Sequence, residues 1–259
     1  MSDSTGPSSL AVFGTLHLAI LVLRRHFVLF FLITVLFLAP QMLFEVDALL
    51  THVLDWPLLW QVLKVIVGQI ARVMISLFLV HAILQAIDGR AVSLKASIFW
   101  GMRSLRPVIA VHFLLFSWFP ITRIFLHEIG FQWYFPLILF EFAVNIVLLT
   151  YFSTALPSLI VERGGILHCL KRSVFLTRGY RWEIVAVWLI ISVVLVAMHF
   201  GAVLTIDVRS GTFGVFILVE QLVGFLQVLF GTILSTVLYL KLRILKEGSD
   251  PDRIAAVFD

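Results

Sequence analysis

Residues 184–206 read IVAVWLIISVVLVAMHFGAVLTI, an apolar run without a single charged side chain. A helix needs about 20 such residues to cross the hydrocarbon core of a bilayer. Further apolar runs long enough to cross lie at residues 27–44, 65–84, 107–122, 133–160 and 213–240. The sequence therefore predicts an all-α, polytopic membrane protein with six transmembrane helices.

The composition agrees with a bilayer as the solvent. Hydrophobic residues make up 61% of the chain, and the mean hydropathy is +1.08. This exceeds what a soluble domain of 259 residues would carry. Charged segments interrupt the runs at Glu45 to Asp55, at 123–128 and at 207–211, so six crossings are the simplest count, and both termini then share a side.

The Lys and Arg residues are distributed unevenly between the connecting segments. The side that carries both termini holds most of the 19: Arg24, Arg25, Arg90, Lys95, Arg103, Arg106, Arg163, Lys171, Arg172, Arg178, Arg181, Lys241, Arg243, Lys246 and Arg253. The opposite side holds Arg123 and Arg209, while Lys64 and Arg72 fall inside apolar runs. Basic loops face the cytoplasm, so we expect both termini there. We expect anionic lipid headgroups, and no nucleic acid, as the partner of this charge, because no soluble basic domain carries it.

The ends of the chain are short and polar. Residues 1–9 do not resemble a secretory signal and are expected to be disordered. A six-helix membrane domain is expected over residues 10–248, followed by a cytoplasmic tail at 249–259, which is too short to be a domain.

Two connecting segments have the pattern of helices that lie in the membrane interface. In residues 93–106 and 165–178, apolar positions follow a helical period and basic positions face elsewhere. Residues 10–23 are apolar nearly all round, so they form either a third such helix or a partly inserted one. The candidate headgroup ligands are Arg24, Arg25, Lys95, Arg103, Arg106, Lys171, Arg172, Arg178 and Arg181. Simple anchoring is the favoured interpretation over specific lipid recognition.

The chain also shows signs of an internal three-fold repeat. Each unit would consist of a basic interfacial segment, an outward helix and a returning helix. The returning helices end alike, with charge and glycine, at Asp88-Gly89, Glu162-Arg163-Gly164 and Lys246-Glu247-Gly248.

Several short motifs resemble a known bacterial family. They include Ala155-Leu156-Pro157, Leu170-Lys171-Arg172-Ser173, Leu176-Thr177-Arg178-Gly179, Arg181-Trp182 and Tyr239-Leu240-Lys241-Leu242-Arg243. The chain is similar to uncharacterised six-span inner-membrane proteins and to the membrane domain of some glycerophosphodiester phosphodiesterases. The resemblance implies a bacterial inner-membrane protein and no activity, because the catalytic barrel of those enzymes is absent from these residues.

Polar groups inside the apolar runs are the other candidates for function. These are Gln69, Arg72, Glu141, Asn145 and Glu220. Placing a charge near the bilayer centre costs about 2.5 kcal/mol or more of insertion free energy, so a charge there indicates a structural or functional role. The favoured interpretation is a structural pair between Arg72 and Glu141, with Asn145 or Gln69 satisfying the remaining hydrogen bonds. The alternative is a polar pathway in which Glu141 and Glu220 take up a proton or cation, or Arg72 binds an anionic headgroup.

Metal, cofactor and nucleophile sites find little support in the sequence. No histidine has another histidine, or the cysteine, three or four residues away. The single cysteine, Cys169, stands near Lys171 and Arg172, which would favour its thiolate, but an inert free thiol is the more ordinary interpretation.

These patterns favour a non-catalytic inner-membrane protein that engages lipid headgroups, and possible membrane-protein partners, as an accessory or membrane-organising component. The alternatives are a small transporter or lipid-handling protein and, third, an intramembrane enzyme. No cofactor is expected.

Overall fold

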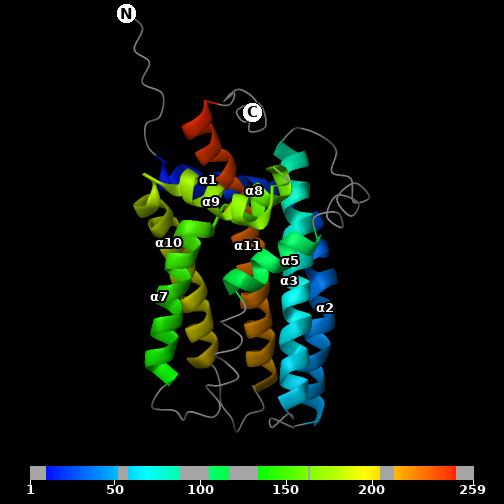
Figure 1. The fold of residues 1–259 in the computed structure, drawn as a ribbon. Helices are drawn as coiled ribbons and strands as arrows, with labels where there is room; N and C mark the ends of the chain where they lie inside the picture. The colour runs from blue at the N-terminus through cyan, green and yellow to red at the C-terminus, as the bar shows by residue number, and fades with distance from the viewer. Residues whose placement is uncertain are drawn as a thin grey trace, which may run out of the picture.

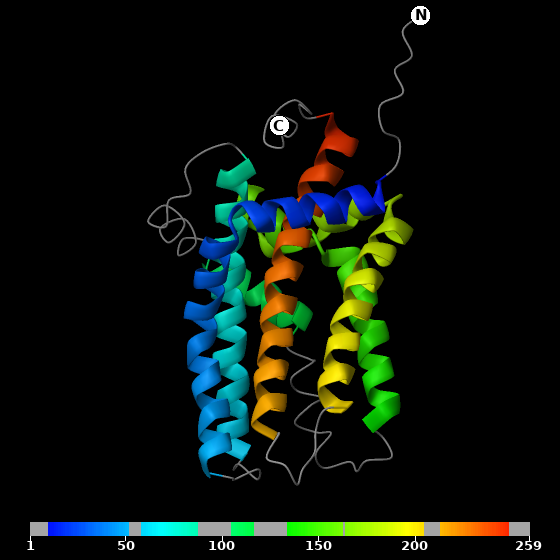
Figure 2. The same cartoon turned by 180° about the vertical axis from the view of Figure 1, so that it is seen from behind.

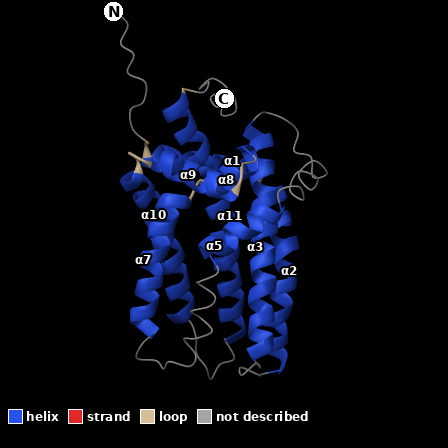
Figure 3. Ribbon diagram, viewed as in Figure 1, coloured by secondary structure: helices blue, strands red, loops and turns tan. Residues whose placement is uncertain are grey.

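In a computed structural model, residues 10–51, 58–87, 105–116, 134–162, 164–204 and 213–248 are described. Helices account for nearly all of these residues, and none of them lies in a strand (Figure 3). The helices are α1 (Val12–Arg25), α2 (Phe27–Thr51), α3 (Leu58–Ile87), α5 (Leu105–Phe116), α7 (Tyr134–Phe152), α8 (Ala155–Glu162), α9 (Ile166–Thr177), α10 (Arg181–Leu204) and α11 (Phe213–Glu247). The all-α prediction is confirmed for this part of the chain.

The long helices α2, α3, α7, α10 and α11 run side by side as a bundle (Figure 1). Two shorter helices, α1 and α9, lie across one end of it, and the end of α11 rises past α1 (Figure 2). The chain bends by 83° between α1 and α2. The segment 10–23 thus belongs to a crosswise helix, as one of the two sequence interpretations expected.

Two glycines close helical segments, and one of them, Gly248, stands at a helix end that the sequence predicts. Gly248 follows the last residue of α11 with φ +63°, and its N–H donates to the carbonyl of Ile244 at 2.9 Å. Gly179 lies between α9 and α10 with φ +95°. Both values fall in the left-handed region, where a side chain would be strained and glycine is the default residue.

Four helical segments are long and apolar enough to cross a membrane: Val62–Ala86, Leu139–Glu162, Arg181–Met198 and Gln221–Glu247. A fifth crossing arises if the bent pair Val12–Arg25 and Phe27–Gln41 counts as one span. The third predicted crossing, 107–122, is not shown. Its described part is the 12-residue α5, which is about 18 Å long and too short for a core about 30 Å thick. The described residues therefore support four to five crossings, and the count of six stays a prediction.

The core has two parts that share α3. One gathers buried side chains of α1, α2, α3, α10 and α11, including Phe30, Leu79 and Tyr239. The other joins α3, α5, α8 and α9, including Leu77, Leu159 and Cys169. Half of the crossing segment is buried in α3 and in α11, but only 17% in α10. The helices α3 and α11 are therefore central, and α10 presents most of its apolar surface outward.

The helix order agrees with two of the three predicted repeat units. α1 precedes the pair α2 and α3, and α9 precedes the pair α10 and α11. The interfacial helix expected in the middle unit, 93–106, lies outside the described residues except for Leu105 and Arg106, which begin α5. The three-fold repeat stays a prediction, as do the expectations for 1–9 and 249–259, which also lie outside the described residues.

Candidate functional site

The helix α9 is the best-defined feature at the end of the bundle. It begins after Gly165 and ends at Thr177, within one residue of each predicted boundary. Its buried residues are Cys169, Ser173, Leu176 and Thr177, at the spacing of three and four that places them on one face. This face packs against α7, α8 and α11, so α9 is fixed to the bundle along its length.

Hydroxyl groups hold the buried face of α9 to the break between α7 and α8. Thr154 donates from Oγ1 to Oγ of Ser173 at 2.8 Å, and Ser173 donates to the carbonyl of Tyr151 at 2.9 Å. Because α7 stops at Phe152, the carbonyl of Tyr151 lies in its last turn, where backbone acceptors lack helical partners. The hydroxyl of Ser173 donates a hydrogen bond to this carbonyl, and together with the hydroxyl of Thr154 it fixes the position of α9.

A network of charged side chains joins α9 to α8 and α11. The Nε of Arg172 donates to Oε1 of Glu162 at 2.8 Å, and its Nη2 is ion-paired with Glu247. The hydroxyl of Tyr239, a fully buried residue of α11, donates to the same Glu162 oxygen at 3.0 Å. Arg243 completes the network by binding Glu247 at 3.2 Å. We call these five residues the end network.

Electrostatics favour the charged state of Arg172 within the end network. Partial burial opposes a charge there, but the hydrogen bonds and charges of Glu162 and Glu247 outweigh it and raise the pKa of the guanidinium. Two carboxylates and two guanidinium groups balance each other. The end network is therefore a neutral anchor and not an exposed basic site.

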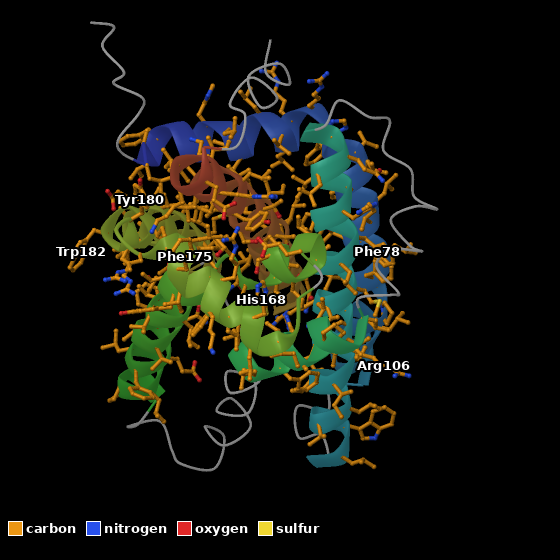
Figure 4. All side chains as sticks on the ribbon, turned by 45° about the horizontal axis from the view of Figure 1, so that its top comes forward. Phe78, Arg106, His168, Phe175, Tyr180 and Trp182 are labelled. Atoms are coloured by element: carbon orange, nitrogen blue, oxygen red, sulfur yellow. The ribbon has the colours of Figure 1, made fainter. Side chains whose placement is uncertain are left out.

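The opposite face of α9 is apolar and basic at once. Leu167 is 72% exposed and Phe175 51%, and Lys171 and Arg178 are exposed between and beyond them. Trp182, at the start of α10, is 84% exposed and points away from the helices (Figure 4). Leu167, Lys171 and Phe175 follow each other at a spacing of four on α9 and so share one face. Arg178 follows the end of α9, and Trp182 lies in the first turn of α10. We call Leu167, Lys171, Phe175, Arg178 and Trp182 the α9 stripe.

The last turn of α11 supports this stripe. Nζ of Lys246 donates to the carbonyl of Phe175 at 3.0 Å and lies 4.9 Å from the centre of its ring. The exposed ring is thus held in place by a cation that covers it. Phe175 is therefore a positioned part of the exposed surface.

The structure separates the predicted headgroup ligands into two groups. Lys171 and Arg178 are exposed in the α9 stripe, and Arg24, Arg25 and Arg106 are exposed elsewhere, with Arg106 projecting outward (Figure 4). Arg172 belongs to the end network, and the guanidinium of Arg181 lies 4.3 Å from the ring centre of Tyr151. The side chains of Arg172 and Arg181 thus make their contacts within the protein. Lys95 and Arg103 lie outside the described residues.

The predicted intramembrane residues fall in different parts of the bundle. Gln69 is buried on α3 and accepts a hydrogen bond from Nε2 of His112 on α5 at 2.8 Å. Glu141 is buried on α7 and Asn145 half-buried one turn later. The side chain of Glu220 lies outside the described part of the structure.

The predicted pair of Arg72 with Glu141 is not formed. Both side chains are described, and no ion pair joins them. The physical reason is the helix packing: α3 packs chiefly against α2, α5, α8 and α11, whereas α7 packs against α9 and α10. Arg72 and Glu141 therefore lie on helices with different packing partners.

Sequence reasoning missed the partners in the end network. Glu162, Tyr239, Arg243 and Glu247 were noticed only as charges or motifs near helix ends. The available signal was that two returning helices end on a glutamate, Glu162 and Glu247, close to the basic Arg172 segment in the topology. Gln41, described below, and the pairing of His112 with Gln69 were missed because single polar residues in apolar helices carry no spacing signal.

The described residues hold no cluster of three or more His, Cys, Asp or Glu side chains that could bind a metal ion. Cys169 is buried, and its Sγ donates to the carbonyl of Ile166 at 3.0 Å. Burial raises the pKa of this thiol from 9.0 to about 11. The neighbouring Lys171 and Arg172 thus do not produce a reactive thiolate.

This shift predicts slow alkylation of Cys169. At pH 8 the native protein should react with a maleimide far more slowly than the denatured chain, and the rate should rise only as the pH approaches 11. Since the folded pKa is the higher one, the thiol's contribution to stability is complete below pH 9 and is lost as the pH rises through 11. Mass spectrometry of timed samples measures the rate. Equal rates for native and denatured protein would contradict the buried position.

Searches against protein families, curated proteins and solved structures found no match to this chain.

Proposed function

We propose that this protein is a non-catalytic, multi-pass membrane protein whose α9 stripe binds anionic lipid headgroups. The carrying observation is the position of the stripe: it runs along α9, which lies across the end of an apolar bundle, to the start of α10, and it is exposed there. A flat helix with apolar and basic side chains on its outer face is the form that binds at the headgroup level.

The individual residues fit this level of the membrane. Tryptophan is enriched at the boundary between hydrocarbon and water, which agrees with the exposure of Trp182. Leu167 and Phe175 would bury apolar surface among the upper acyl chains, while Lys171 and Arg178 would meet phosphates. Each cation near an anionic surface contributes about 1 kcal/mol. The two together account for about 2 kcal/mol, or roughly 30-fold in affinity for an anionic lipid.

The placement in the cell is part of the same proposal. The distribution of Lys and Arg supports cytoplasmic termini, a cytoplasmic α9 and six crossings, and the resemblance of the motifs supports a bacterial inner membrane. In this role the protein would organise anionic lipid, or present it to a membrane-protein partner, at the cytoplasmic surface.

Native mass spectrometry of the protein released from native membrane discs tests the proposal. The wild-type protein should retain an anionic phospholipid, and the double variant Lys171→Gln, Arg178→Gln should lose most of it. The matched control is Lys171→Arg, Arg178→Lys, which keeps both charges at the same positions and should retain the lipid. Equal retention by the Gln variant, or a wild-type protein without lipid, would exclude headgroup binding by the stripe.

A further inference from the structure

A second polar feature lies inside the bundle, far from the α9 stripe in sequence. On α3, Gln69 and Arg72 are three residues apart, and Gln69 is hydrogen-bonded to His112 of α5. The guanidinium of Arg72 is close enough to that imidazole to interact with it electrostatically. Side chains of α3 and α5 thus bring a cation, an imidazole and an amide together among apolar residues.

The helix α2 adds a fourth polar group. Gly68 lies one turn before Arg72 on the same strip of α3, and a Cβ atom there would come within 3.0 Å of Oε1 of Gln41. A side chain at this position would crowd the amide of Gln41, which would have to shift by a few tenths of an ångström. Gln41, Gln69, Arg72 and His112 are therefore contributed by three helices, and we call them the inner polar cluster.

In the inner polar cluster, Nε of Arg72 and Oε1 of Gln41 are buried without a hydrogen-bond partner among the described residues. No described carboxylate is ion-paired with Arg72, although it lies near the middle of the crossing segment Val62–Ala86. Arg72 is half-buried as a residue, with its Nε fully buried, and a cation without a counter-charge is unfavourable in this position, so the arrangement favours a compensating anion.

We propose that the inner polar cluster is an oxyanion-binding site within the membrane domain. Arg72 would supply the charge and a fork of N–H donors that matches the two oxygens of a carboxylate or phosphate group. The amide of Gln41 can rotate to present its NH2 group, and Gln69, held by His112, keeps Arg72 and α5 in register. The single positive charge suits a ligand with one negative charge, such as a carboxylate or the phosphodiester of a lipid headgroup.

The experiment measures thermal unfolding of the purified protein in a neutral maltoside detergent, at constant ionic strength. The probes are sodium acetate, inorganic phosphate and dioctanoyl phosphatidylglycerol, with sodium chloride as the reference. At least one oxyanion probe should raise the Tm of the wild-type protein in a saturable way. A response to acetate or phosphate identifies a soluble ligand as the source, and a response to the lipid alone identifies a headgroup.

The variant Arg72→Gln should lower the affinity for the responding probe roughly 10-fold or more, because a charged hydrogen bond is lost. The variant Lys171→Gln, Arg178→Gln should leave this response unchanged, which separates the inner polar cluster from the α9 stripe. If Arg72→Gln does not fold, Gln41→Leu takes its place and should weaken the response several-fold. An absent wild-type response, or equal responses in the wild-type and cluster variants, would overturn the proposal.

Discussion

Replacing Arg172 with alanine is expected to lower the free energy of unfolding of this protein by about 2–4 kcal/mol. Arg172 is the only member of the end network that contacts both Glu162 and Glu247 among the described residues. Without it, two partly buried carboxylates, with side chains 18% and 29% exposed, lose the cation that they share. Removing one partner of such a pair costs more than the pair contributes, because a desolvated charge remains.

The neighbouring residue provides the control. Lys171→Ala removes the same charge from the same helix, but Lys171 is exposed and so should change the stability by less than about 0.5 kcal/mol. Reversible unfolding in mixed micelles measures both variants. A double variant, Arg172→Ala with Glu162→Ala, should recover part of the loss. Equal effects of the two single variants would show that the end network does not anchor α9.

Replacing Val193 with arginine is expected to cost about 2.5–3.5 kcal/mol, which would reduce the amount of folded protein in the membrane severely. Val193 is 64% exposed on the outward face of α10, inside the crossing segment Arg181–Met198. If lipid covers this face, the new charge must enter hydrocarbon. The measurements are the yield from the membrane fraction and the Tm of what is recovered.

The matched control places arginine at Leu167, which is 72% exposed on α9. At the headgroup level an additional cation is tolerated, so Leu167→Arg should reach a yield close to that of the wild-type protein. Val193→Ala, which introduces no charge, should do so as well. A Val193→Arg variant as abundant as both controls would mean that α10 faces water.

Hydropathy predicted the helical class and most of the long helices, because the cost of exposing backbone groups to lipid leaves few alternatives. The predicted run 184–206 corresponds to α10, and 65–84 to most of the crossing part of α3. Only residues 107–116 of the run 107–122 lie in the described structure, as part of α5, so this crossing stays a prediction. Apolar composition indicates burial in either lipid or protein, and α5 contributes to a core shared with α3, α8 and α9.

The boundaries of α9 were predictable because its apolar and basic positions follow a clear helical period. Its partners were not. Arg172 and Lys171 are adjacent cations in the sequence, and only the packing of α8 and α11 decides that Arg172 is paired and Lys171 exposed. The same holds for Arg72, which the sequence assigned to Glu141 although α3 and α7 belong to different parts of the bundle. Long-range pairing depends on helix packing, and one sequence contains no direct record of it.

The depth of α9 in the membrane is the most direct test of the account. On a Cys169→Ala background, single cysteines replace Leu167, Phe175 and Val193 in turn and carry a nitroxide spin label in vesicles of anionic lipid. Collision with oxygen and with a water-soluble nickel complex then reports the depth of each label. We expect the labels at 167 and 175 at the headgroup level and the label at 193 deep in hydrocarbon. Labels at 167 and 175 that behave as in bulk water would contradict the central claim.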